Sequence, residues 1–274
     1  MIVMLAVATL SLDLWMHRRV EEIGGINKWG YRGPVAKRKQ AGDVRVVVLG
    51  GSGTFGRGVL ADQTFAASLG RYVRQGWRPV HLEVPVSAVN LAAPLDGPSS
   101  FAQTLRDYLY LRPDVAIFVA EAEPRADAGS EAPEGWRRTS AVFRRTGYLP
   151  LLPDALWGQT EPPIAAAVEA DTIMAEAYCD SIVRAVNAAL THGTRALVVS
   201  APHQAAAATD LQPAVAAALQ RRFTSGEPVR YVDLGRLVNM EDTTMSFDGV
   251  HLTAVGHEQI AEALTVPLLE VLQQ

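Results

Sequence analysis

Cysteine is nearly absent from this 274-residue sequence, since Cys179 has no second cysteine to pair with. A single cysteine excludes an intrachain disulfide framework and a cysteine-rich zinc site. Because Cys179 lies in a stretch with a helical pattern, we predict a buried structural role for its thiol. No histidine stands with an acidic residue at metal-ligand spacing, so neither a metal nor an organic cofactor is expected.

A surplus of positive charge is also missing. The chain has 25 Lys and Arg against 29 Asp and Glu, which gives a formal net charge of −4. A nucleic-acid footprint needs a basic surface, so nucleic acid is not an expected partner. Arginine pairs occur at 137–138 and 144–145, and we interpret them as a solvated basic face. The 49% of apolar residues can fill the core of one large domain.

The N-terminal run MIVMLAVATLSLDLWMHRRV is apolar from Ile2 to Leu12 and is then interrupted by Asp13. It is short of the roughly 20 apolar residues of a spanning helix, and it lacks the basic start and cleavage site of a secretory signal. Three interpretations stay open: a membrane anchor with a clipped start, a degenerate signal, and an amphipathic helix packed on the domain. We favour the anchor, which predicts membrane association and a cell-envelope location; without it, a cytoplasmic location is expected.

After this hydrophobic helix of residues 1–20, residues 21–43 are rich in Gly, Pro and Lys and are predicted to form an extended linker. From residue 44 to 274, apolar runs typical of strands alternate with helical patterns. Strands are predicted at 44–49, 80–89, 114–119, 195–200 and 228–234. Helices are predicted at 63–75, 99–111, 172–190 and 211–223, and from about 253 onward. Such alternation predicts a doubly wound, three-layer α/β/α sandwich with a central five-stranded parallel sheet.

One segment interrupts this alternation. Residues 121–171 contain repeated Pro, Gly and charged residues and carry Trp136, Tyr148 and Trp157. The segment is too long for an ordinary connection between a strand and a helix, so we interpret it as an insertion that forms a lid or a substrate wall. Trp136 and Trp157 are candidates for stacking on a sugar or acyl group, and packing under their own loop is the alternative.

The stretch VVVLGGSGTFGRG, residues 46–58, places a glycine-rich turn with one serine after the first strand. It contains the pattern G-x-G-x-x-G, but a dinucleotide site also needs an immediate helix and an acidic residue about 20 positions later, and the region near position 71 reads RYVRQ. A phosphate loop needs Lys and then Ser or Thr where Arg57 and Gly58 stand. The turn therefore favours Ser52 as a nucleophile, with a dinucleotide site and a plain turn serine as alternatives.

A serine nucleophile needs a histidine to accept its proton and an acid to orient that histidine. The segment FDGVHLTAVGHEQIAEAL supplies Asp248 and His251, three residues apart in a loop before the last helix. One turn can direct both side chains toward the carboxyl edge of the sheet, so we predict Ser52, Asp248 and His251 as catalytic residues. Capping or loop roles are their alternatives. His257 is predicted to be structural, and His203 is a candidate for lining the pocket.

With these residues in place, the sequence resembles the SGNH hydrolase superfamily, also called GDSL-type esterases and lipases. The first family block, an apolar strand followed by G-D-S-x-x-x-G or G-G-S-x-T-F-G, is similar to LGGSGTFGRGV, with Ser52 as nucleophile. The last block, D-x-x-H-x-T-x-x-G, is similar to residues 248–256, which include Asp248 and His251. The run NKWGYRGP resembles the lead-in of membrane-anchored bacterial members. The likeness covers about residues 30–270.

The resemblance implies an oxyanion held by the serine N–H, a glycine N–H of the second block and an asparagine side chain of the third. The second block usually reads N-L-G-x-P-G. Here it reads NLAAPLDG, so Leu95 stands where the oxyanion glycine should be and Gly97 follows two residues later. The third block should end G-x-N-D, but Glu123 stands at the asparagine position. An ionised carboxylate there would repel the oxyanion, whereas a protonated one could donate a hydrogen bond.

These residues predict a serine ester hydrolase that acts on a small-molecule or glycan ester, such as an acetyl group on an envelope glycan. Two alternatives stay open because of Glu123. One is a catalytically impaired binding module on the same fold. The other is an acyltransferase-like or lyase-like variant that uses Glu123 differently.

Overall fold

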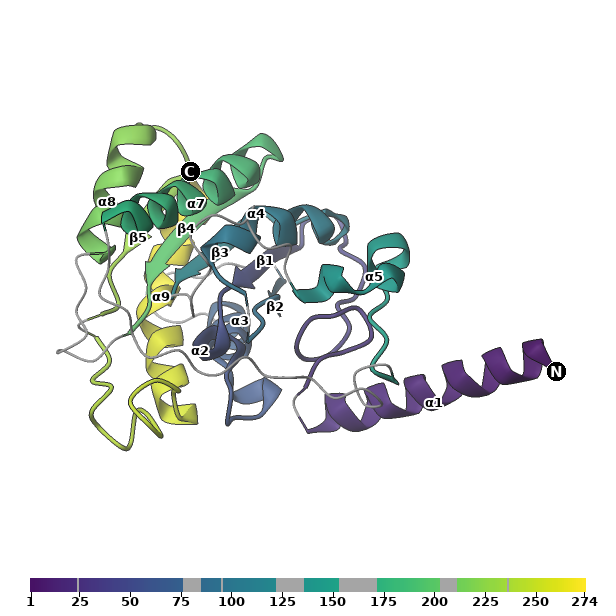
Figure 1. The fold of residues 1–274 in the computed structure, drawn as a ribbon. Coiled ribbons are helices and arrows are strands. Elements are labelled where there is room, and N and C mark those ends of the chain that lie inside the picture. Colours follow the sequence, from purple (N-terminus) through teal and green to yellow (C-terminus); the bar gives the residue numbers. More distant parts are fainter. Residues whose placement is uncertain are drawn as a thin grey trace.

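The computed structural model describes residues 1–23, 25–75, 85–94, 96–121, 136–152, 172–202, 211–235 and 237–274. The N-terminal helix α1 (Ile2–Glu22) precedes a domain of alternating strands and helices (Figure 1). The strands are β1 (Val44–Leu49), β2 (Val86–Asn90), β3 (Val115–Ala120), β4 (Arg195–Ser200) and β5 (Val229–Val232). The helices are α2 (Ser52–Phe55), α3 (Phe65–Gln75), α4 (Pro98–Asp107), α5 (Ala141–Thr146), α7 (Thr172–Thr191), α8 (Leu211–Arg222) and α9 (Ala254–Gln273). Short 3-10 turns are η1 (Ala61–Gln63), η2 (Leu109–Leu111) and η3 (Trp136–Thr139).

The five strands form one parallel sheet in the order β2-β1-β3-β4-β5. The apolar runs of β1, β3 and β4 are typical of strands that are covered on both faces. The chain leaves β1 toward β2 on one side and returns to β3 on the other. The carboxyl ends of β1 and β3 therefore flank a topological switch point, where open α/β sheets form their binding sites.

Helices cover both faces of this sheet, as Figure 1 shows. On one face α3 and α9 pack together, and Phe65, Leu69 and Val73 of α3 are at most 2% exposed. On the other face lie α4, α7 and α8, whose buried residues include Leu105 and Ile182. The predicted three-layer α/β/α sandwich with a five-stranded parallel sheet is confirmed.

The segment predicted to be an extended linker is partly packed into the protein. Asn27, Tyr31 and Arg32 are all at most 5% exposed, because Gly30 and Gly33 adopt positive φ angles and turn the chain back on the domain. The N–H of Arg32 donates to the carbonyl of Asn90 at 3.0 Å, which joins this segment to the end of β2. Residues 26–33 therefore belong to the folded body. The boundary placed at residue 44 stays a prediction.

Helix α1 contacts the rest of the protein through its C-terminal half and projects from the body in Figure 1. Asp13 and His17 are buried, whereas the large apolar side chains within residues 2–12 are exposed. The Asp13 carboxylate accepts a hydrogen bond from the Leu151 N–H at 2.8 Å, and the His17 Nε2 lies 2.8 Å from the Leu149 carbonyl oxygen. Among the helices in the described ranges, none is long and apolar enough to cross a membrane. The anchor stays a prediction.

One of the two arginine pairs departs from the predicted solvated face. Arg137 is 2% exposed, and its guanidinium lies 2.5 Å from the carboxylate of Asp96. It also donates to the carbonyl of Gly30 at 2.6 Å, so it joins two segments that are far apart in the sequence. The prediction was wrong for Arg137 because a buried carboxylate partner compensates its desolvation. Arg144 and Arg145 are exposed, as predicted.

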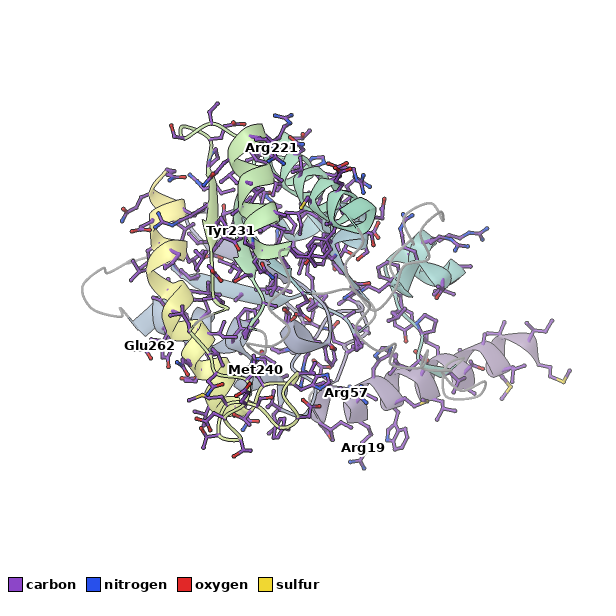
Figure 2. The ribbon with its side chains drawn as sticks, turned by 60° about the vertical axis from the view of Figure 1, so that its left-hand side comes forward. Arg19, Arg57, Arg221, Tyr231, Met240 and Glu262 are labelled. Atoms are coloured by element: carbon purple, nitrogen blue, oxygen red, sulfur yellow. The ribbon has the colours of Figure 1, made fainter. Side chains whose placement is uncertain are left out.

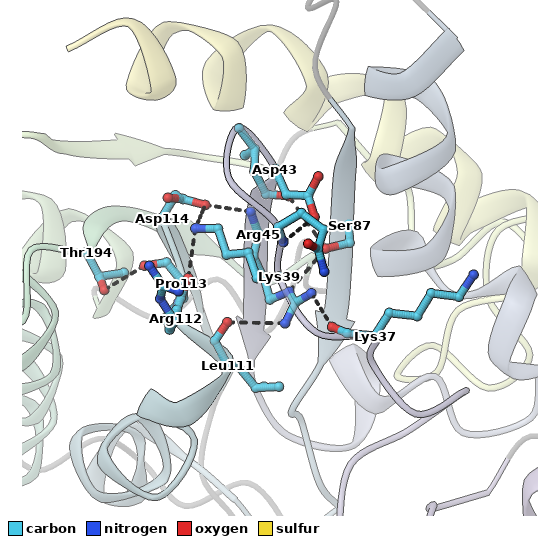
Figure 3. Close-up of polar contacts among 12 residues, drawn as sticks. Lys37, Lys39, Asp43, Arg45, Ser87, Leu111, Arg112, Pro113, Asp114 and Thr194 are labelled. Atoms are coloured by element: carbon cyan, nitrogen blue, oxygen red, sulfur yellow. Dashed lines mark hydrogen bonds and ion pairs between the residues drawn. The ribbon is translucent and has the colours of Figure 1, made fainter.

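The amino edge of the sheet is closed by its own polar groups (Figure 3). Asp114, just before β3, accepts hydrogen bonds from the Lys39 ammonium and from the backbone N–H of Arg45, both at 2.6 Å. The Arg45 guanidinium donates to the carbonyls of Lys37 at 2.7 Å and Leu111 at 3.2 Å. These groups satisfy one another, so a functional site is expected at the opposite, carboxyl edge of the sheet.

Candidate active site

Ser52 begins a single helical turn, α2, three residues after the end of β1. The turn ends at Gly56, whose φ of 85° lies in the left-handed region that favours glycine. A Cβ at Gly56 would lie only 2.7 Å from the Thr64 methyl carbon, so close packing also requires glycine here. The Gly56 N–H donates to the Ser52 carbonyl at 3.2 Å. Glycine at position 56 thus permits the tight turn that presents Ser52, which is partly buried.

Two side chains satisfy the carbonyl groups at the C-terminal end of α2. Arg32 donates to the Phe55 carbonyl, and to the Gly56 carbonyl at 2.7 Å. Asn90, the last residue of β2, donates from Nδ2 to the Thr54 carbonyl at 3.1 Å. Burial lowers the pKa of Arg32 to about 10, which still leaves it charged at neutral pH. A cation at this end of a helical turn is also favoured by the turn's dipole.

A carboxylate lies at the other end of α2. Glu121, directly after β3, accepts hydrogen bonds from the backbone N–H of Gly53 at 3.1 Å and of Thr54 at 2.7 Å, and from the Thr54 hydroxyl. Burial raises the pKa of Glu121, and the hydrogen bonds from Thr54 and Gly53 oppose that rise. Sequence reasoning missed Glu121. The available signal was its place as the first residue after β3, at the same sheet edge as the glycine-rich turn.

Asp248 and His251 form a hydrogen-bonded pair. The Asp248 Oδ2 lies 2.7 Å from the His251 Nδ1. The other carboxylate oxygen, Oδ1, accepts the backbone N–H of His251 at 2.7 Å and of Val250 at 2.9 Å. Burial would raise the pKa of Asp248, but these hydrogen bonds from His251 and Val250 outweigh it and lower the pKa to about 2. Asp248 is therefore ionised at neutral pH and holds the imidazole with Nε2 free to act as a base.

The loop that carries this pair contacts the segment that follows the Ser52 turn. Both lie at one end of the sheet, where Figure 2 labels Arg57 on the first loop and Met240 on the second. A Cβ at Gly58 would lie 2.9 Å from the ring of Phe247, the residue before Asp248. The Ser52 hydroxyl and the His251 imidazole form no hydrogen bond with each other, although both residues are described. Their meeting during catalysis stays a prediction.

The second family block also lies beside Ser52. The Asp96 carbonyl oxygen is 3.0 Å from the position that a Cβ would take at Gly51. Gly97 is buried and is the N-cap residue of α4, and its carbonyl accepts the Ser100 hydroxyl at 2.9 Å. Four other candidates lie outside the described residues: Leu95, Glu123, His203 and Trp157. Of Trp136 only the backbone is described.

Two residues predicted to be structural are buried. His257 is 0% exposed, stacks on Phe65, and accepts the Phe65 N–H on Nδ1 at 3.3 Å. Burial, together with the charge of Arg32, lowers the pKa of His257 to about 4. Cys179 is 7% exposed, and burial raises the pKa of its thiol, which suits an unreactive residue. Within the described ranges, no cluster of three His, Cys, Asp or Glu side chains could hold a metal ion.

Comparisons with known proteins agree with this architecture. No family model and no curated protein matches the sequence, but solved structures do. A Clostridium thermocellum family 3 carbohydrate esterase is similar over 84% of this chain and 98% of its own, with a TM-score of 0.54 and 14% identity. TesA is similar over 83% and 99%, with a TM-score of 0.52 and 11% identity. The esterase EstA from Pseudoalteromonas sp. is similar over 84% and 99%, with a TM-score of 0.52 and 8% identity.

Identities this low establish the fold alone. The chain therefore has the fold of the GDSL-type, or SGNH, esterases and lipases, which is the fold that the two end blocks of its sequence imply.

Proposed function

We propose that this protein is a serine ester hydrolase in which Ser52 is the nucleophile, His251 the general base and Asp248 the residue that orients His251. The observation that carries the proposal is the Asp248–His251 pair, 2.7 Å apart. Its loop contacts the segment that follows the Ser52 turn, at the carboxyl edge of the sheet. Acyl transfer by a serine requires these three residue types at one site, which is what the proposal assigns to Ser52, His251 and Asp248.

Each residue has one role in the reaction. His251 Nε2 takes the proton from the Ser52 hydroxyl as Ser52 Oγ attacks the ester carbonyl, and Asp248 stabilises the imidazolium that forms. The proton then passes to the leaving alcohol, and an acyl group remains on Ser52. Water, activated by the same imidazole, releases the acid and restores the hydroxyl.

The oxyanion site is expected to include the backbone N–H of Ser52 and one from the second block, at Leu95 or Gly97. The asparagine donor of the family is replaced by Glu123. Loss of one such donor typically costs about 10²–10³-fold in rate, which predicts a slow or specialised enzyme. Glu123→Asn should then raise kcat. An unchanged kcat would show that the donor at this position does not limit the reaction.

The substrate class is proposed from the fold's neighbours and from the insertion. The likeness to a carbohydrate esterase and the two tryptophans of residues 121–171 both support an ester on a glycan, an acetyl ester above all. Hydrolysis of acetylated oligosaccharides should therefore exceed hydrolysis of long-chain acyl esters at equal concentration. The reverse preference would contradict the glycan assignment and leave the triad standing.

A fluorophosphonate probe tests the triad directly. The wild-type protein should be labelled at Ser52, and should hydrolyse a short-chain aryl acetate faster than the matched Ser52→Ala variant. Equal turnover by both proteins, together with no labelling of Ser52, would refute the proposal and favour a binding module on a hydrolase fold. Ser99→Ala, which changes a serine in the first turn of α4, is a suitable control and should retain wild-type labelling.

A further inference from the structure

The turn that carries Ser52 has no cap of its own. Its N-cap residue is Gly51, which offers no side chain, and no side chain at that position bonds the turn. An N-cap side chain normally accepts the N–H of the second or third helical residue. In α2 those residues are Gly53 and Thr54, and both N–H groups donate to Glu121 instead.

The glycines on either side of Ser52 make room for this carboxylate. A Cβ at Gly51 would lie 2.8 Å from Glu121 Oε2, and one at Gly53 would lie 3.3 Å from the same oxygen. The sequence Gly-Ser-Gly at 51–53 therefore has a steric cause that is separate from phosphate binding. The backbone of Glu121 is itself held, because the Tyr178 hydroxyl donates to its carbonyl at 2.9 Å.

We propose that Glu121 is a positioning residue for Ser52: from the end of β3 it caps α2 in place of a side chain at Gly51, and so holds the hydroxyl in its reactive position. This inference rests on the proposed function of Ser52. Glu121 bonds the amides of the turn, and no hydrogen bond joins it to the Ser52 hydroxyl within the described contacts. It acts on the reaction through the turn alone.

The arrangement holds both ends of α2. Arg32 and Asn90 occupy the carbonyl groups, and Glu121 occupies the N–H groups, so the turn has little freedom to rotate. Removal of Glu121 leaves the N–H groups at the start of α2 without their acceptor. A displacement of the nucleophile by about 1 Å can cost about 100-fold in rate, even when the substituted residue does not touch the substrate. The loss should appear in kcat, with KM unchanged, because substrate contacts are retained.

A swap of the cap tests the inference. Glu121→Ala should lower kcat about 100-fold and lower the thermal midpoint. Adding Gly51→Asp to Glu121→Ala returns a carboxylate to the same amides from the N-cap itself, and should restore part of both quantities. Gly51→Ala with Glu121→Ala is the matched control, since it adds a Cβ without a carboxylate, and should restore neither. Glu121→Gln retains one accepting oxygen, so its kcat and thermal midpoint should fall less than those of Glu121→Ala. This variant supplies the test if the alanine variant does not fold.

Asp114→Ala separates positioning from general stability. Asp114 stands just before β3 and accepts a backbone N–H of β1 at the amino edge of the sheet (Figure 3), whereas Ser52 follows the carboxyl end of β1. Its loss should lower the thermal midpoint and leave kcat unchanged. Wild-type kcat in Glu121→Ala, or equal behaviour of the aspartate swap and its alanine control, would overturn the inference. If Ser52→Ala shows that the proposed function fails, the capping role of Glu121 can still be tested. The thermal midpoints of the Gly51→Asp and Gly51→Ala double variants can be compared without any measurement of turnover.

Discussion

The buried imidazole of His257 should make the protein lose stability as the pH falls from 6.5 to 4. His257 is 0% exposed near the start of α9, and its Nδ1 accepts the Phe65 N–H at 3.3 Å. This bond requires the unprotonated form of Nδ1, so protonation would break it and place a charge in the core. Asn at position 257 is the perturbation of choice, because its side-chain oxygen can accept the same N–H and does not titrate.

The magnitude follows from the pKa of His257, which burial and Arg32 lower from 6.5 to about 4. A group whose pKa is lower in the folded state stabilises the fold above its unfolded pKa, and this contribution is lost as the pH falls through the folded pKa. The window is therefore pH 6.5 to 4. A fall in pKa of this size corresponds to about 3 kcal/mol in the free energy of unfolding.

Urea unfolding at a series of pH values between 7 and 4 measures this effect. The free energy of unfolding of the wild type should fall by about 3 kcal/mol more than that of His257→Asn. At pH 7 the variant should be the less stable protein, because it loses ring packing against Phe65. His192→Asn, at an exposed position, should follow the wild-type curve. Parallel curves for the wild type and His257→Asn would refute the assignment of this pH dependence to His257.

Three further outcomes are expected. Arg137→Met should destabilise the protein by about 3–5 kcal/mol in urea unfolding, since it leaves the carboxylate of Asp96 buried without its cation; a loss below about 1 kcal/mol would contradict this. Gly56→Ala should cost about 1–3 kcal/mol by thermal unfolding and lower kcat, because φ is 85° and the new methyl group would meet Thr64; unchanged kcat would show that the turn tolerates the strain. Asp248→Asn should lower kcat at neutral pH by about 10⁴-fold in an esterase assay. Because the pKa of Asp248 is lowered from 3.8 to about 2, its stabilising contribution is present above pH 3.8 and is lost as the pH falls through 2; the stability curve of Asp248→Asn should be flatter over that window.

The strands and helices could be predicted because each is encoded locally. The predicted strand at 195–200 coincides with β4, and the predicted helix at 172–190 with α7 to within one residue. Buried parallel strands are uniform apolar runs, and apolar residues recur every three to four positions in the helices that cover them. Both patterns can therefore be recognised without tertiary information. The ends are less regular: the strand predicted at 228–234 is shortened to Val229–Val232, since pairing with β4 decides its length.

Only part of the candidate site could be predicted, because only some of its contacts are local in the sequence. Asp248 and His251 stand three residues apart and contact each other within one loop, so their pairing follows from local spacing. Glu121 contacts Gly53 and Thr54 from the end of the neighbouring strand, and the sequence indicates only the shared sheet edge, not the contact. Likewise the burial of Arg137 depends on Asp96, a partner from another segment. Sequence patterns do not predict which distant residue a charged side chain will contact.

The pairing of Leu49 in β1 with Phe118 in β3 sets which residues beyond the two strands lie opposite each other. Ser52 stands three residues beyond Leu49, and Glu121 stands three residues beyond Phe118. One residue inserted into or deleted from β3 would turn Glu121 to the other face of the sheet and away from the amides it bonds. The length of β3 is thus constrained as tightly as the identity of Ser52, although no residue of β3 belongs to the proposed triad. Homologous chains of different length should differ after position 121, and not between 115 and 121.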